Sequence, residues 1–476
     1  MKKKFQFLWI VRAAIGMLLL LAIAIMPASA DDPVSGGDLS EFAGFPGEAL
    51  SEPGPAPEAS PRARAADIVL LGHADPGGGF NADVVAHGEF AYMGSWGNSF
   101  GGGIFCPSQG VRVFSLHDPS NPTHVSTFAD AASEPDLAGT WTEKVIVQHV
   151  NTSSFNGDLA AVSIQSCVDG SFRGFGLWDV SDPANPQRLA LYSAPNTDGS
   201  HEIWLEKRGN GAFVYTAIPF SELTTSPDGG VTPGQADFRI VDVSDPTNPA
   251  DVGEWGAWQE LGIFPITENA NGVVRVNFVH SVIGEGTKAY LSYWDLGTVI
   301  LDVSDPANPE FLGRTTFADH EEGNAHSSWL GKGGNLLIQT DEDFNPAPDP
   351  VLETAWGYPR FFDISNPSNP VALSTFKLPT TTQFPPPVGF FSVHDPKVKG
   401  SLVYFSWYSE GVVVVDISRP ANPRLVAQFV PEPAADPRGF FAPPDVEFPF
   451  VWGTFVHRNY VLASDINSGL WVFQLR

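Results

Sequence analysis

The sequence of 476 residues has few cysteines, few basic residues, and no long hydrophobic run beyond its N-terminal segment. Two cysteines are too few for a disulfide-dense scaffold. The 26 Lys and Arg residues are outnumbered by 54 Asp and Glu residues, which gives a net charge of −28. Nucleic acid and anionic lipid are therefore poor partners, and no membrane span is expected after the N-terminal segment.

The sequence also lacks the short motifs of several enzyme classes. It contains no Gly-x-x-x-x-Gly-Lys-Ser/Thr phosphate loop and no His-Glu-x-x-His zinc motif. Asp341-Glu-Asp343 lacks the ligand spacing of an EF-hand loop. These observations disfavour P-loop nucleotide chemistry, a zincin protease and an EF-hand calcium site.

The first 30 residues have the composition of an export signal. Basic residues precede an apolar run from Ala13 to Met26, and Ala28-Ser-Ala30 supplies the small residues of a cleavage site. The run is short for a membrane span, although an uncleaved anchor stays an alternative. Residues 31–66, rich in Pro, Gly and acids, predict a disordered acidic linker. We expect a secreted or cell-surface protein, and a monomer.

A phrase ending in Pro-x-Asn-Pro recurs throughout the rest of the chain. A fixed period indicates one supersecondary unit used repeatedly. Each unit contains runs of β-branched and aromatic residues bounded by Gly, Asn and Pro, and Pro-x-Asn-Pro must lie between strands because proline cannot donate to a sheet. Four strands per unit predict the blade of a β-propeller. The six phrases have their first prolines at Pro119, Pro183, Pro246, Pro306, Pro367 and Pro420.

The two ends of the chain indicate the number of blades. A seventh unit begins near Val446, has three strands, and lacks the Pro-x-Asn-Pro turn. Asp67–Gly72, before the first full unit, has the pattern of an isolated fourth strand. Pairing these segments would close the ring and remove its open edge. We therefore predict an all-β fold, a seven-bladed β-propeller over residues 67–476 with four antiparallel strands per blade, closed by the N-terminal strand.

The repeated strand and turn resemble a known family. The segment Gly411-Val-Val-Val-Val-Asp-Ile-Ser-Arg-Pro-Ala-Asn-Pro423 is similar to the unit of the LVIVD-repeat family of secreted β-propellers. Similar units occur in choice-of-anchor surface proteins of bacteria. The resemblance covers roughly residues 67–476, and it implies a propeller fold and an extracytoplasmic location. It does not imply one activity, because propellers host unrelated functions.

One repeat position holds histidine in five units and an acid in two. The first strand of each blade lines the central channel, so we expect these side chains to converge there. Asp341 and other acids lie in loops that should emerge on the same face, together with the long insertions that usually carry function. The candidate metal ligands are His149, His201, His280, His326, His394, Asp83, Glu447 and Asp341.

Three interpretations of this position remain open. Imidazoles with carboxylates are typical ligands of a transition metal such as Zn, Cu or Fe, and would allow a metal-dependent enzyme. Alternatively, the histidines form a structural ring in a surface module that binds a protein or glycan. A metal-free acid–base site is the third. Residues that could line a ligand pocket beside the ring are Trp294, Asp295, Glu342 and Trp407.

The two cysteines lie in corresponding loops of the first and second repeats. An even number of cysteines in an exported protein favours a disulfide. We therefore predict a bond between Cys106 and Cys167 that joins adjacent blades, with two unpaired thiols as the alternative.

Overall fold

The computed structural model describes residues 68–97, 106–195, 199–224, 232–268, 272–321, 323–344 and 351–476. The expected signal segment (1–30) and linker (31–66) lie outside these ranges. Within them, no helix is long and apolar enough to cross a membrane.

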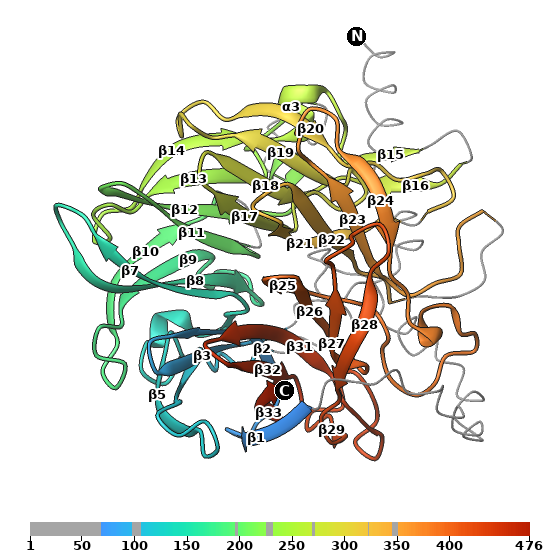
Figure 1. Ribbon diagram of the computed structural model, residues 1–476. Coiled ribbons are helices and arrows are strands. Elements are labelled where there is room, and N and C mark those ends of the chain that lie inside the picture. Colours follow the sequence, from blue (N-terminus) through green and yellow to red (C-terminus); the bar gives the residue numbers. More distant parts are fainter. Residues whose placement is uncertain are drawn as a thin grey trace, which may run out of the picture.

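Seven antiparallel sheets form a closed ring, as Figure 1 shows. The first strands of neighbouring blades contact one another all the way around, and the last of them contacts the first. The fold is a seven-bladed β-propeller with four strands per blade, as the sequence predicts. Blades 1 to 3 are β2 (Asn81–His87), β3 (Phe90–Ser95), β4 (Val111–Ser115) and β5 (Thr123–Phe128); β7 (Val145–Asn151), β8 (Asn156–Ser166), β9 (Gly174–Asp179) and β10 (Gln187–Ser193); and β11 (Ile203–Arg208), β12 (Gly211–Ala217), β13 (Phe238–Asp242) and β14 (Ala250–Trp255).

The remaining blades repeat this order along the chain. Blades 4 to 6 are β17 (Ser281–Glu285), β18 (Lys288–Ser292), β19 (Thr298–Asp302) and β20 (Glu310–Arg314); β21 (Ala325–Gly331), β22 (Leu336–Asp341), β23 (Pro359–Asp363) and β24 (Val371–Thr375); and β25 (Pro396–Lys399), β26 (Leu402–Trp407), β27 (Gly411–Asp416) and β28 (Arg424–Phe429). Blade 7 consists of β31 (Val451–His457), β32 (Tyr460–Asp465), β33 (Gly469–Leu475) and β1 (Ile68–Ala74).

Short elements occupy the loops between these strands. They are β6 (Thr140–Trp141), which pairs with the end of β8, the two-stranded sheets β15 (Ile266–Glu268) with β16 (Val274–Val276) and β29 (Ala434–Ala435) with β30 (Glu447–Phe448), the helices α2 (Ser221–Thr224) and α3 (Ala257–Leu261), and the 3-10 turns η2 (Pro135–Leu137) and η3 (Pro379–Thr382).

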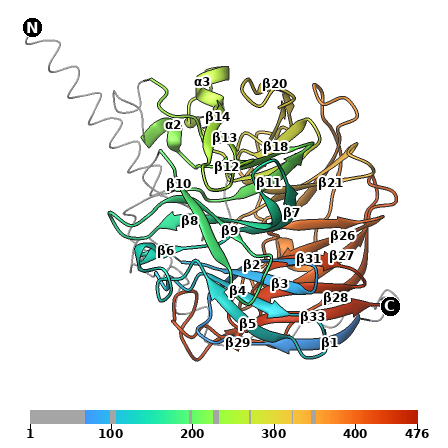
Figure 2. The ribbon, with the colours of Figure 1, turned by 90° about the vertical axis from the view of Figure 1, so that its left-hand side faces the viewer.

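The N-terminal strand closes the ring. β1 pairs antiparallel with β33, from Ile68 opposite Leu475 to Ala74 opposite Leu470. The two strands lie together in both ribbon views (Figures 1 and 2). This closure removes the unpaired edge that a three-stranded seventh blade would leave.

The Pro-x-Asn-Pro phrases form the corners between the third and fourth strands. In the fourth-blade corner, Asp305 accepts the backbone N–H of Ala307 and the side-chain amide of Asn308. Asp182 does the same in the second blade. An Asx turn followed by proline stops a strand and reverses the chain.

Apolar side chains of the strands fill the space between blades. In β27, Val412 to Val415 are all fully buried, because both faces of each sheet pack against a neighbour. The predicted disulfide is confirmed: Cys106, in the β3–β4 loop, is bonded to Cys167, which directly follows β8. It therefore joins blade 1 to blade 2.

Candidate metal centre

Four of the five predicted histidines lie together near the start of the first strands. His201, His280 and His394 stand one or two residues before β11, β17 and β25, and His326 is the second residue of β21. All four are at most 2% exposed. Along this histidine cluster the ring centroids are 4.3 Å apart for His201–His280, 3.9 Å for His280–His326 and 4.2 Å for His326–His394.

Equivalent backbone contacts give three of these histidines the same place in their blades. The backbone N–H groups of His201, His280 and His394 each donate to a carbonyl at or next to the end of the second strand, namely Ala217, Ser292 and Ser406. In blade 5 a bulge between Ala325 and Ser327 in the pairing with β22 contains His326. A bulge re-aims a side chain, which explains how a residue inside a strand joins the cluster.

The ring nitrogens are arranged as in metal-binding histidines. Nδ1 of His201 lies 2.6 Å from the Gln165 side-chain oxygen, Nδ1 of His280 lies 3.1 Å from the His326 carbonyl, and Nδ1 of His394 lies 2.7 Å from the Trp452 carbonyl. Because each partner is an oxygen acceptor, we assign the proton to Nδ1 in all three rings. In a neutral imidazole, Nε2 then carries the lone pair that binds metal.

Two of these Nε2 atoms face each other. The distance between His201 Nε2 and His280 Nε2 is 2.8 Å. With both Nδ1 atoms protonated, two lone pairs meet unless a cation lies beside them or one ring becomes an imidazolium. An imidazolium at a position without solvent contact is costly. Nitrogens bound to one metal at about 2.0–2.1 Å lie this close to each other when the N–metal–N angle is near 90°, as in square or octahedral sites.

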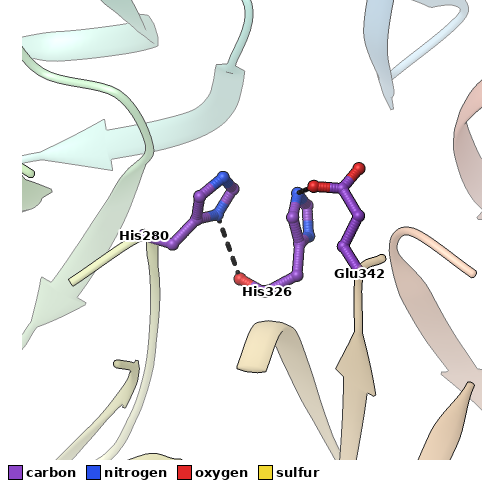
Figure 3. A group of neighbouring side chains, drawn as sticks. All are labelled: His280, His326 and Glu342. Carbon is purple, nitrogen blue, oxygen red and sulfur yellow. Dashed lines mark hydrogen bonds and ion pairs between the residues drawn. The ribbon is translucent and has the colours of Figure 1, made fainter. Parts of the chain in front are cut away.

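A carboxylate completes the group of possible ligands. Figure 3 shows His280 from the segment before β17, His326 from β21 and Glu342 directly after β22. One donor atom from each lies within 4.8 Å of the others, and His326 Nε2 is 3.5 Å from Glu342 Oε2. The Tyr408 hydroxyl donates to the other oxygen of Glu342 and fixes the carboxylate. All three ligand candidates are fully buried.

Burial keeps His326 neutral. Its pKa lies well below the usual value, mainly because of desolvation, with further lowering by His394, His201 and Lys144. A neutral imidazole is the form that binds a metal ion. The cluster is therefore available to a cation at neutral pH without competition from a proton at this residue.

His149 does not reach the cluster. It lies in the outer half of β7, its side chain is 54% exposed, and it contacts Asp158 at 2.8 Å. Glu143 takes the expected place in blade 2 instead. The next residue, Lys144, donates its backbone N–H to the Ser163 hydroxyl just as Asp395, after His394, donates to Ser406.

Glu447 is likewise displaced from the expected position. It is exposed in the short strand β30, and Trp452 stands where the repeat predicts an acid. The following residue, Gly453, donates its backbone N–H to the Ser464 hydroxyl, which repeats the pattern of blades 2 and 6. The Trp452 indole N–H donates to Glu143 at 2.8 Å. Neither residue was predicted from the sequence as part of the site, and the two contact each other.

The other two predicted carboxylate ligands have protein partners of their own. Asp83 is buried and lies 2.9 Å from the Lys144 ammonium. Asp341 pairs with Arg360 and accepts from Gln339 at 2.8 Å. Burial raises the pKa of Asp341 to about 6, although Arg360 opposes this effect. Neither residue shares the group formed by His280, His326 and Glu342.

The residues expected to line a pocket divide into two pairs. Trp294 packs 5.4 Å from the His280 ring, and Glu342 contacts His326. Asp295 instead accepts the backbone N–H groups of Val276 and Asn324, and burial raises its pKa to about 6. Trp407 is buried in the core and donates to the Phe391 carbonyl.

Aromatic side chains cover the histidine cluster on the side of the long loops. Trp141 lies 6.0 Å from the His201 ring, and Tyr408 and Trp452 lie 5.3 Å and 4.6 Å from that of His394. We call the aromatic cover the apolar cluster that contains Phe80, Trp96, Trp141, Trp356, Phe390, Phe391, Tyr408, Phe448, Phe450 and Trp452. The site is therefore enclosed within the channel.

Fold and site together define the chain as a seven-bladed β-propeller with buried histidines near its axis. Residues 231–255, 281–316, 361–377 and 392–430 match the family model for the LVIVD repeat. The protein is thus a seven-bladed β-propeller that contains LVIVD repeats. Of the histidine cluster only His394 falls inside a matched range, so the repeat accounts for the scaffold rather than for the site.

Other comparisons add little to this assignment. No curated protein matches the chain. Among solved structures, the crystal structure of the computationally designed Ika8 protein is similar at 8% sequence identity, with a TM-score of 0.46. The match covers 85% of this chain and 99% of the designed protein.

Proposed function

We propose that this LVIVD-repeat propeller is an exported protein that binds one first-row transition metal ion in its channel. His280, His326 and Glu342 are the first ligands, and His201 supplies the fourth position through Nε2. Three to four nitrogen and oxygen donors are the usual set for Zn, and imidazole also suits Cu and Fe.

The observation that carries this proposal is the pair of Nε2 atoms 2.8 Å apart whose rings already direct Nδ1 toward oxygen acceptors. In a purely structural ring, turning one imidazole so that a nitrogen donor meets an acceptor would give an arrangement of lower free energy. Outer contacts such as these orient metal-bound histidines. Tyr408 plays the corresponding part for Glu342.

Export is supported by two independent features. The first 30 residues have the composition of a cleavable signal, and a disulfide joins blades 1 and 2. Disulfides persist in oxidising compartments and are rare in the cytosol. An enclosed site favours a metal that is held tightly over one exchanged with solvent.

Elemental analysis tests the metal site. After dialysis, the purified protein should retain about one Zn, Cu or Fe ion per chain, and the His280→Ala, His326→Ala double variant should retain none. His149→Ala is the matched control, because that histidine is exposed and lies outside the cluster. Its metal content should equal that of the wild type.

A metal-free wild type that takes up none of the three ions and keeps its thermal midpoint on their addition would refute the metal site. The intact mass of the same sample tests cleavage of the export signal, because a chain that keeps residues 1–30 contradicts it.

A further inference from the structure

A cavity of about 280 Å³ lies in the central channel, beyond the histidine cluster as seen from the aromatic cover. It is lined by residues further along the first strands, such as Val85, Ile146 and Ile283. These positions lead toward the turns between first and second strands, and Trp204, Trp329 and Phe455 on its wall are partly exposed. The cavity is distinct from the enclosed metal site, although the two adjoin.

The inner end of the cavity is an ion cluster formed by Asp83, Lys144, Glu202, Asp395 and Lys397. The Lys144 ammonium lies 2.9 Å from Asp83, 3.2 Å from Glu202 and 3.4 Å from Asp395. Lys397 pairs with Asp395 as well. All five residues are less than 8% exposed.

Carboxylates outnumber ammonium groups in this ion cluster. Three carboxylates face two ammonium groups, and both ammonium groups are already held by carboxylates. An anionic ligand would meet this excess of negative charge in a region of low dielectric, where repulsion is strong. A cationic group would balance it. The net charge of −28 also draws cations toward the protein.

The wall of the cavity is apolar and aromatic. Val85, Ile146 and Ile283 line it from the first strands of blades 1, 2 and 4. The Trp204 and Trp329 rings pack edge to face with their centroids 5.7 Å apart. Flat apolar groups and cations both bind well against tryptophan. Lys397 already lies 4.7 Å above the Trp329 ring, which shows that this wall accepts an ammonium.

One buried hydroxyl on the cavity has no protein partner within the described ranges. Ser328 is 1% exposed, lines the cavity, and its Oγ makes no hydrogen bond to any described residue. Buried polar groups are nearly always hydrogen-bonded in native proteins. A hydroxyl left over beside an ion cluster therefore points to a bound molecule with a polar head.

We propose that this channel cavity binds a small organic amine with an aromatic-sized apolar body. The ammonium enters the ion cluster beside Glu202 and Asp83, with Ser328 as a further acceptor, and the body packs against Trp204, Trp329 and Phe455. Binding requires no metal, so this proposal stands or falls separately from the metal site.

Calorimetric titration of the full chain with three probes of similar size tests the amine site. 2-Phenylethylamine should bind at least about tenfold more tightly than the neutral 2-phenylethanol, the difference expected for a charge-assisted contact. Phenylacetate should not bind. Chelator-treated protein and the His280→Ala, His326→Ala variant, if folded, should bind the amine as the wild type does.

Two variants separate charge from shape. Glu202→Gln should weaken amine binding about tenfold or more and leave alcohol binding unchanged. Ile283→Trp fills the cavity without altering its charge and should abolish binding of both. Glu89→Gln, a partly exposed residue outside the cavity, is the control and should bind normally.

Absence of amine binding, or phenylacetate binding as tightly as the amine, would overturn the proposal. So would an Ile283→Trp protein that still binds the amine. If Glu202→Gln does not fold, Ile283→Trp and the three probes remain sufficient, because neither test replaces a residue of the ion cluster. If ammonium chloride at equal concentration competed with the amine, the apolar body would contribute nothing to affinity, and this result would also contradict the proposal.

Discussion

At the scale of single residues, Lys144 contacts three carboxylates in the channel. It is 7% exposed and stands among the carboxylates of Asp83, Glu202 and Asp395, which come from blades 1, 3 and 6. The pKa of Lys144 is raised well above its usual value by these acids, although burial alone would lower it. One ammonium thus connects three blades across the axis.

Replacing this ammonium should destabilise the fold. Lys144→Met leaves buried carboxylates without their cation, and removing one partner of a buried ion pair costs about 3–5 kcal/mol. We expect a lower midpoint of urea unfolding, with Lys207→Met as the control, because Lys207 is exposed and should change stability by no more than about 0.5 kcal/mol. Equal midpoints for the two variants would contradict this role of Lys144.

A buried acid, Glu222, makes the stability of the fold depend on pH. Glu222 accepts the backbone N–H groups of Trp258 and Gln259 at the start of α3. Burial raises the pKa of Glu222 from 4.5 to about 7, with additional raising by Glu260 and Glu254. Asp237, whose carboxylate accepts the Glu222 backbone N–H, has a raised pKa for the same reason, as does Tyr293 beside it.

The sign of the effect follows from the raised pKa of Glu222. The folded protein holds a proton that the unfolded chain releases above pH 4.5, so this stabilisation is complete below that pH and is lost as pH rises through 7. Between pH 5.5 and 8 the wild type should lose roughly 1–3 kcal/mol that Glu222→Gln does not lose. Unfolding at both pH values measures this difference, and exposed Glu268→Gln is the control. Identical pH dependence in Glu222→Gln and wild type would refute it.

At the scale of elements, the strands and corners were predictable because they depend on local chemistry. Pro-x-Asn-Pro fixes where a strand ends whatever surrounds it, so the six corners marked six repeats and their strand order, and the two chain ends indicated the seventh blade. The histidine position depends on register instead. His149 lies six residues beyond Glu143, and a strand shows no local sign of which residue reaches the axis.

A weaker signal in the sequence could have corrected that register. In blades 2, 6 and 7 a serine near the end of the second strand accepts a backbone N–H from the residue that follows the position facing the axis. These serines are Ser163, Ser406 and Ser464. Counting from these serines selects Glu143 and Trp452. The rest of the aromatic cover had no such signal, because its other members come from segments between the blade strands that differ in length and sequence from blade to blade.

At the scale of the whole molecule, the channel is organised in layers along the axis. The aromatic cover lies on the long-loop side, the histidine cluster follows, and the ion cluster and apolar cavity lie beyond it. Neighbouring residues of one chain segment serve adjacent layers, as His201-Glu202 and His394-Asp395 do just before β11 and β25. All layers depend on the ring being closed, because each draws residues from several blades.

Closure depends on β1, and truncation tests it. Deleting residues 31–60 removes a segment with linker composition and should leave the thermal midpoint unchanged. Deleting residues 31–72 removes most of the strand paired with β33 and the apolar contacts of Ile68 and Leu71, so the midpoint should fall by roughly 5 °C or more. Equal midpoints for the two truncations would show that β1 does not hold the ring.

A peptide added in trans separates loss of this strand from a general folding defect. The longer truncation exposes the edge of β33, whose free N–H and carbonyl groups favour association between chains. A synthetic peptide of residues 67–76 should pair with this edge, raise the midpoint toward that of the shorter truncation, and restore a monomeric elution volume. A scrambled peptide should do neither, because the register from Ile68 to Ala74 places alternate side chains against the neighbouring blades.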